Sequence, residues 1–257
     1  VISGKAAVAV GTDLLYASIT KSAGILAHGK LGNIDWKLVL TLGLGSVPAS
    51  FVTTLLLADL GIASDSLVDS IKFWLGIALL LTSLSVLFRH ELVKSANHRQ
   101  LLNPAVTPAI TVLLGVVLGF LVTLTSVGAG ALGVTALLLL YPHLHINRIV
   151  GSDVAHAVPL TLVAGLGHAS IGTVDYGLLG TLLIGSVPGI WIGSHMTQMV
   201  GEVWVRNLLA LILVYVGQKL ALPELHQGIG VALLLSVAVA KFVLDGRKLK
   251  PLVTDET

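Results

Sequence analysis

The chain has 257 residues, of which 55% are hydrophobic and only 11% are Asp, Glu, Lys or Arg, with a formal net charge of +2. Soluble domains carry about 25% charged residues, so this chain has too little charge for a wetted surface. The composition excludes an ordinary cytosolic enzyme, a nucleic-acid-binding protein and a disordered segment. The absence of cysteine excludes a disulfide framework and a thiolate metal site. The sequence is that of an integral membrane protein.

Stretches without charged residues locate the membrane segments, because a crossing helix needs about 20 mostly apolar residues. The sequence predicts an all-α polytopic membrane protein with about eight or nine membrane segments. The 48 residues 100–147 hold one full span and a shorter element, about 129–141, after a break near Ser126. In chain order the apolar stretches are 5–28, 38–58, 73–88, 100–147, 154–174, 176–201, 207–218 and 225–240.

The positions of Lys and Arg predict how these segments are oriented. When residues 88–104 are placed in the cytoplasm and the spans alternate, 11 of the 15 basic residues lie inside and three lie outside. This distribution satisfies the positive-inside rule. We therefore expect a multi-pass protein of the plasma (inner) membrane, surrounded by lipid, whose chain starts outside and whose C-terminus is cytoplasmic.

The chain matches itself at an offset of 140 residues. Gly-Thr-Asp at 11–13 lies over Gly-Ser-Asp at 151–153, and Gly-Ser-Val-Pro at 45–48 lies over the same four residues at 185–188. Shared leucines would be expected by chance in so apolar a sequence, but these paired polar motifs would not. The match predicts two repeats, the first within 1–100 and the second within 101–257.

The predicted orientation makes the repeats inverted. Loop 29–36 falls in the cytoplasm and its partner loop 169–176 falls outside, so a two-fold axis in the membrane plane relates the halves. Inverted repeats are characteristic of secondary transporters, which bind substrate near mid-membrane between the halves. The equivalent of Gly128 in the first repeat would precede Val1, so we expect an N-terminal half-hairpin to be missing.

A glycine-rich stretch opens the short segment at about 129–141. Ser126, Gly128, Gly130 and Gly133 let the backbone approach a ligand, and a helix that starts there aims unpaired N–H groups and its positive dipole end at that point. This pattern predicts a substrate-binding cradle for an anion. Close packing of helices through small residues is the alternative explanation.

Two acidic residues, Asp13 and Asp153, occupy equivalent positions within predicted spans. An ionised Asp at the bilayer centre costs about 2.5–3.5 kcal/mol, so each should face a polar cavity or a donor. One interpretation is a gate at a broken helix, or a proton-carrying acid coupled to anion movement. The other is that each Asp caps a helix start at the membrane surface. Candidate substrate contacts next to these acids are Gly11, Thr12, Gly151 and Ser152.

Four further residues are candidates for the transport mechanism. Lys21 lies within a span and could neutralise an anionic substrate, or could extend to the interface as a long side chain near a helix end does. His156 is a candidate proton carrier or a hydrogen-bonded packing histidine. Pro48 and Pro188 interrupt the backbone hydrogen bonding of their spans, which makes each a candidate hinge or a packing residue.

Several of these motifs resemble the sulfite exporter TauE/SafE family, also called the sulfonate uptake permease family. They are AVGTDLLYA at 9–17, GAGALG at 128–133, IVGSD at 149–153, and the paired GxIDW at 32–36 and GxVDY at 172–176. The likeness covers most of the chain. It implies a polytopic permease with about eight spans that moves small sulfur-containing oxyanions or organosulfonates, such as sulfite, without ATP.

These observations favour a secondary transporter of small anions that works by alternating access between inverted repeats, with protons as a candidate coupling ion. No cofactor and no metal site is expected. Two other functions stay open: an intramembrane enzyme that uses Asp13 and Asp153 as an adjacent acid pair, and a passive channel subunit. The repeat favours the transporter, because an enzyme has no need of inverted halves. The sequence does not indicate the oligomeric state.

Overall fold

The computed structural model describes residues 3–60, 65–88, 105–128, 130–199 and 202–222. In these ranges the fold is entirely helical, which confirms the predicted class. The helices are α1 (Ser3–Lys30), α2 (Trp36–Leu60), α3 (Asp65–Leu87), α5 (Thr107–Thr125), α6 (Ala131–Leu140), α7 (Ile146–Ser170), α8 (Tyr176–Met199) and α9 (Glu202–Ala221).

Three of these helices, α2, α5 and α7, are long and apolar enough to cross a membrane, and shorter apolar stretches lie in α3, α6, α8 and α9. The first eight predicted segments thus correspond to helices, including the short one, α6. The predicted segment 225–240 and the C-terminal tail lie outside the described residues. The boundary between the repeats near residue 100 does so too.

The ends of α7 differ from the predicted span 154–174, because the helix begins at Ile146 and ends at Ser170. The prediction stopped at charged residues, but Arg148 and Asp153 both lie inside the helix. Arg148 pairs with Asp35 at 3.3 Å, and Asp153 interacts electrostatically with Lys21. Charges that find partners do not end a membrane helix.

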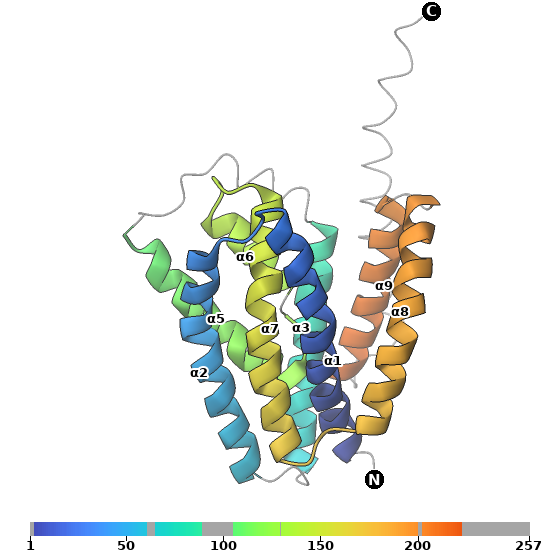
Figure 1. The fold of residues 1–257 in the computed structure, drawn as a ribbon. Helices are drawn as coiled ribbons and strands as arrows, with labels where there is room; N and C mark the ends of the chain where they lie inside the picture. The colour runs from blue at the N-terminus through green and yellow to red at the C-terminus, as the bar shows by residue number, and fades with distance from the viewer. Residues whose placement is uncertain (1–2, 61–64, 89–104, 129, 200–201, 223–257) are drawn as a thin grey trace, which may run out of the picture.

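The two repeats run in opposite directions. In Figure 1, α1 runs upward from the N-terminus, whereas its repeat mate α7 runs downward. Likewise α2 descends and its mate α8 ascends, so the α1–α2 loop and the α7–α8 loop lie at opposite ends of the bundle (Figure 1). The predicted inversion of the repeats is confirmed.

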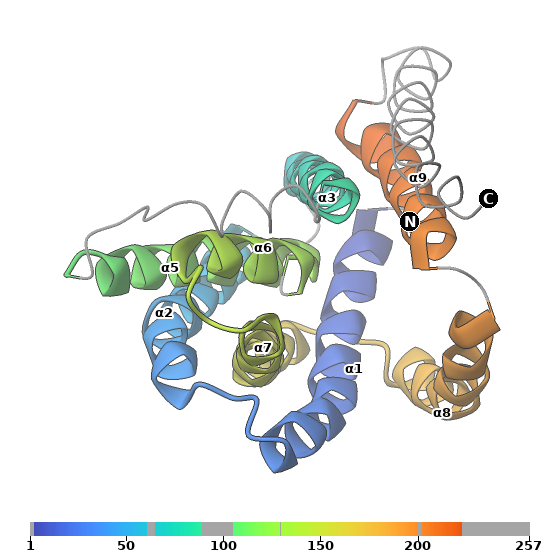
Figure 2. The ribbon, with the colours of Figure 1, turned by 90° about the horizontal axis from the view of Figure 1, so that it is seen from above.

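Helices of one repeat pack mainly against helices of the other. The most extensive contacts join α2 to α5, α3 to α9 and α1 to α7, and Figure 2 shows α1 and α7 next to one another in the middle of the molecule. Glycines allow this close approach, as is common in membranes. A Cβ added to Gly119 of α5 would lie 2.3 Å from the carbonyl oxygen of Ser46 in α2, and one on Gly76 of α3 would lie 2.6 Å from that of Gly217 in α9.

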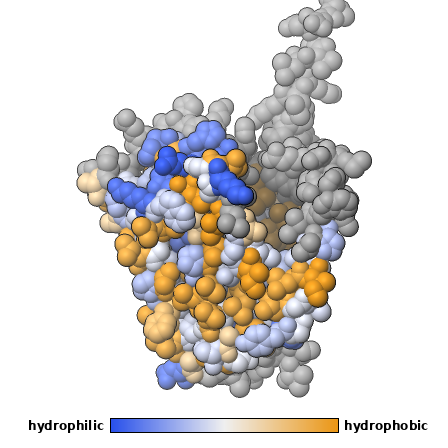
Figure 3. Space-filling view, in the orientation of Figure 1, coloured by the Kyte–Doolittle hydropathy of each residue, from blue (hydrophilic) through white to orange (hydrophobic). Residues whose placement is uncertain are grey.

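The outer surface has the pattern expected of a membrane protein. An apolar band covers the middle of the face in Figure 3, and hydrophilic residues gather at the end where the α1–α2 loop lies. Trp36 and Tyr176 begin α2 and α8 at the two opposite ends and are 58% and 66% exposed. Aromatic residues at these levels anchor a protein in the two membrane interfaces.

Candidate functional site between α1 and α7

The contact between α1 and α7 depends on two equivalent glycines. A Cβ on Gly11 would lie 2.1 Å from the carbonyl oxygen of Thr173, and a Cβ on Gly151 would lie 2.1 Å from that of Asn33. Residues 11 and 151 are repeat mates, as are 33 and 173. The backbone of the loop of the opposite repeat therefore packs directly against each glycine, and a side chain at either position would clash with it.

A hydroxyl next to each glycine holds the same loop. The backbone N–H of Asp175 donates to Thr12 Oγ1 at 3.0 Å, and the N–H of Asp35 donates to Ser152 Oγ at 2.8 Å. Thr12 and Ser152 are both buried. These two predicted substrate contacts thus already have partners in the structure, which are the backbones of the loops.

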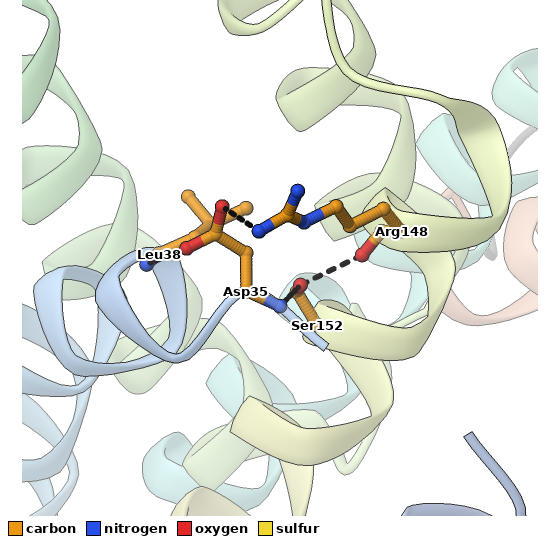
Figure 4. A network of polar contacts seen from close by, with 4 residues as sticks. All are labelled: Asp35, Leu38, Arg148 and Ser152. Atoms are coloured by element: carbon orange, nitrogen blue, oxygen red, sulfur yellow. Dashed lines mark hydrogen bonds and ion pairs between the residues drawn. The ribbon is translucent and has the colours of Figure 1, made fainter. Parts of the chain in front are cut away.

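One of the two loops carries an additional ion pair. The Arg148 guanidinium lies 3.3 Å from the Asp35 carboxylate, and Figure 4 shows both side chains beside the hydrogen bond to Ser152. The Asp35 carboxylate also accepts the N–H of Leu38 at 3.2 Å, which caps the start of α2. Sequence reasoning placed Asp35 and Arg148 in loops on one side of the membrane but did not pair them.

The predicted break near Ser126 is present between α5 and α6. Ser126 has φ +59°, Gly128 has φ +128° and Gly130 has φ +117°, all in conformations that favour glycine. Ser126 adopts this positive-φ backbone conformation although it is not a glycine, and its Oγ donates to Asp13 Oδ2 at 2.5 Å. After the break α6 has 10 residues, or about 15 Å, which is half the thickness of the hydrocarbon core.

Asp153 lies at the beginning of α6. Its side chain is 1% exposed, and its Oδ1 has no hydrogen-bond partner among the described residues. The carboxylate interacts with the backbone N–H of Gly130, the residue before α6. A Cβ on Gly133 would lie 2.2 Å from Oδ1, so this glycine is what lets α6 approach. The fold therefore brings Gly130 and Gly133 together with Asp153, although they were predicted as separate features.

Lys21 lies close to the pseudo-two-fold axis. Leu15 of α1 contacts Gly165, and Gly24 contacts Val154. On the pseudo-two-fold axis, a residue of α1 lies opposite its own repeat mate, the residue 140 positions later in α7. The two contacts place this point between residues 15 and 24 of α1, near Lys21. The repeat mate of Lys21 is Thr161, so the equivalent position in α7 is uncharged.

The Lys21 ammonium interacts electrostatically with Asp153 and, more weakly, with Asp13. The side chain is half-buried and lies nine residues before the end of α1. Lys21 is therefore a cation that interacts with both carboxylates, close to the level of the pseudo-two-fold axis.

Asp13 and Asp153 themselves are far apart. Asp153 is level with Gly24, which is eleven residues, or about 16 Å, along α1 from Asp13. Asp13 is exposed and bonded to Ser126, whereas Asp153 is buried against α6. An intramembrane enzyme with an acid pair would need the two carboxylates side by side, and the geometry does not provide this.

His156 links α7 to α2. It is fully buried, its Nε2 lies 2.7 Å from Ser46 Oγ, and its Nδ1 has no partner in the part of the chain that the structure describes. It also interacts electrostatically with Lys21. The equivalent serine, Ser186, instead donates to Leu183 in its own helix. The importance of Ser46 was not visible in the sequence, where it was one member of a repeated Gly-Ser-Val-Pro.

The two candidate hinges lie away from this centre. Pro48 and Pro188 are exposed within α2 and α8. Pro48 lines an apolar groove of about 690 Å³ between α2 and α5, which Trp74 borders. A third helical proline, Pro159, is three residues beyond His156 in α7, and sequence reasoning overlooked it. A role as hinge stays a prediction for Pro48 and Pro188.

Comparisons with known proteins agree with this architecture. A family model described as "Sulfite exporter TauE/SafE" matches residues 1–220. The chain is 39% identical over 215 residues to the "Probable membrane transporter protein YjnA" of Bacillus subtilis (strain 168), a match that covers 83% of this chain and 84% of the relative. It is 28% identical over 220 residues to the "Probable membrane transporter protein MJ0441" of Methanocaldococcus jannaschii, covering 81% and 77%. No solved structure matches the chain significantly.

Proposed function

The chain belongs to the sulfite exporter TauE/SafE family, and from this membership we propose that it is a secondary transporter of small sulfur-containing anions, such as sulfite and organosulfonates. It is a membrane transporter; the substrate and the mechanism are the parts that we propose. Transport proceeds by alternating access, in which a site near mid-membrane opens to one face at a time.

The observation that carries this proposal is the position of Lys21. A cation near the pseudo-two-fold axis can attract an anion from either face, and it interacts electrostatically with Asp153, which lies against the start of α6. The first N–H groups of a helix have no carbonyl partner within it and favour an anion. In the proposal, Lys21 supplies the charge and the start of α6 at Gly130 supplies backbone donors for a small oxyanion with several acceptor oxygens, while Gly133 keeps the first turn of α6 open.

Charge also supports an orientation. The end of the bundle that holds the α1–α2 loop carries Lys30, Lys37 and Arg148, and this is the cytoplasmic face in the proposal. The opposite loop, 171–175, has no basic residue. In this proposal the protein lies in the plasma (inner) membrane and its C-terminus is in the cytoplasm.

Flux through reconstituted protein tests the proposal. Proteoliposomes that contain the chain should take up labelled sulfite or taurine in response to a pH gradient, whereas empty liposomes should not. The Lys21→Gln variant should lose about ten-fold or more in apparent affinity, since a charged hydrogen bond contributes about 1.5–3 kcal/mol. Lys219→Gln, which alters an exposed lysine of α9, is the matched control. Absence of flux for sulfite, sulfonates and carboxylates alike would refute the proposed function.

A further inference from the structure

Asp153 lies where an anion at the start of α6 would bind. Its Oδ1 lies against Gly133 of α6 and has no hydrogen-bond partner among the described residues, and the carboxylate interacts electrostatically with Lys21. The same carboxylate is buried at the first turn of α6, where Gly133 contacts its Oδ1. The anion site is therefore already filled by a negative charge that belongs to the protein.

We propose that the substrate anion and the ionised Asp153 carboxylate compete for Lys21 and the start of α6, so that an anion binds only after Asp153 has taken up a proton. This inference rests on the proposed function and adds a coupling ion to it. It also assigns different roles to Asp153 and Asp13, which the sequence presents as equivalent.

Charge balance explains the competition. Lys21 and an ionised Asp153 together carry no net charge, and a monovalent anion added to them would leave one uncompensated negative charge in a buried site. Such a charge is costly inside a membrane. When Asp153 binds a proton from water, Lys21 and the anion again sum to zero. The empty and the loaded site are then both neutral, and one proton crosses with each monovalent anion.

The other titratable groups near the site are Asp13, His156 and His28, and His156 also interacts electrostatically with Lys21. On α1, Asp13 is bonded to Ser126, and on α7, His156 is bonded to Ser46. His28, whose Nδ1 has no partner among the described residues, lies against Gly151, seven residues or about two helical turns beyond Lys21 toward the α1–α2 loop. From α6, Gly133 lies against Asp153, and no residue of α6 is titratable.

The position of Asp13 makes it a matched control. It is the repeat mate of Asp153, but it is exposed and accepts a hydrogen bond from the Ser126 hydroxyl, whereas Asp153 is buried against Gly133 of α6. If coupling depends only on having an acid in this motif, the two residues should behave alike. If it depends on competition for the α6 start, only Asp153 should matter.

Binding of methanesulfonate, which stays ionised at all mildly acidic and alkaline pH values, provides the test. Its affinity for the purified wild-type protein, followed by thermal shift, should fall about ten-fold for each pH unit on the alkaline side, because binding one anion takes up one proton. A pH-indicator dye in weakly buffered solution should record that uptake directly. Asp153→Asn should bind with an affinity independent of pH, and Asp13→Asn should keep the wild-type dependence.

The outcomes separate the two proposals. Binding of methanesulfonate that is equally tight at all pH values, without proton uptake, would overturn the competition and leave the proposed function intact. Loss of the pH dependence in His156→Gln together with its retention in Asp153→Asn would also overturn it. If neither methanesulfonate nor sulfite binds at any pH, the proposed function itself fails. The wild-type proton-uptake measurement decides the question even if Asp153→Asn does not fold.

Discussion

Asp35 and Arg148 form an ion pair between the two repeats, and among the described residues no equivalent pair joins the repeats at the opposite end of the bundle. The repeat mate of Asp35 is Asp175, but the residue equivalent to Arg148 is Val8. The backbone contacts of the two loops are otherwise the same, with Asp35 bonded to Ser152 and Asp175 bonded to Thr12. One loop is therefore held by a hydrogen bond and a charge, and the other by the hydrogen bond.

Removing the charge should have a small effect that depends on salt. The Arg148 side chain is 50% exposed, and exposed ion pairs contribute up to about 1 kcal/mol. We expect Arg148→Gln to lower the free energy of unfolding by no more than this, and the difference from wild type to shrink as salt is added. Unfolding in detergent at low and high ionic strength measures it. A difference that is the same at both would contradict an electrostatic origin.

The glycine contacts should tolerate no methyl group. Gly151→Ala places a Cβ 2.1 Å from the Asn33 carbonyl oxygen, so we expect a loss of about 1–3 kcal/mol from overpacking. Gly180→Ala in α8 is the control, because nothing lies within 4 Å of its Cβ position, and a gain of up to about 1 kcal/mol in helix propensity is expected there. Thermal unfolding of the two variants should shift in opposite directions; equal shifts would argue against the close contact.

Ser46 should matter more than its repeat mate Ser186. Ser46→Ala leaves the fully buried ring of His156 without its 2.7 Å partner, which costs about 1–3 kcal/mol. Ser186→Ala removes only a hydroxyl that bonds to its own helix. Unfolding measurements on both variants compare them directly. If Ser186→Ala were as destabilising as Ser46→Ala, the bond to His156 would not be the cause.

The inversion of the repeats can be tested by labelling, because the chain contains no cysteine. Lys30 and Ser170 are repeat mates and both are exposed. In sealed vesicles of one orientation, a membrane-impermeant thiol reagent should modify Lys30→Cys or Ser170→Cys from opposite sides. Modification of both from the same side would contradict the antiparallel arrangement of α1 and α7.

The fold could be predicted from the sequence because three independent patterns agree: the apolar stretches, the 140-residue repeat and the charges of the loops. The apolar stretches located the helices, and the 140-residue match with the loop charges gave the inversion. The break near Ser126 was predicted because the 48 uncharged residues 100–147 are too many for one membrane helix. The ends of α7 were wrong because a charged residue was treated as the end of a span, although Arg148 has a partner in Asp35.

The site was less accessible to such reasoning. Asp153 and Gly130 were each singled out, but they come from different helices, and only the packing of α6 on α7 joins them. The central level of Lys21 depends on the register between α1 and α7, which glycine contacts determine. The bond between Ser46 and His156 spans 110 residues and follows no periodicity in the chain.

The packing of each helix on the opposite repeat has a consequence for movement. The loop of the first repeat is fastened to α7 and the loop of the second is fastened to α1, while α2 rests on α5 and α3 rests on α9. A rigid-body rotation of one repeat against the other would break these hydrogen bonds and helix contacts together. We therefore expect each moving unit to contain helices of both repeats, with its hinges inside the repeats and not between them.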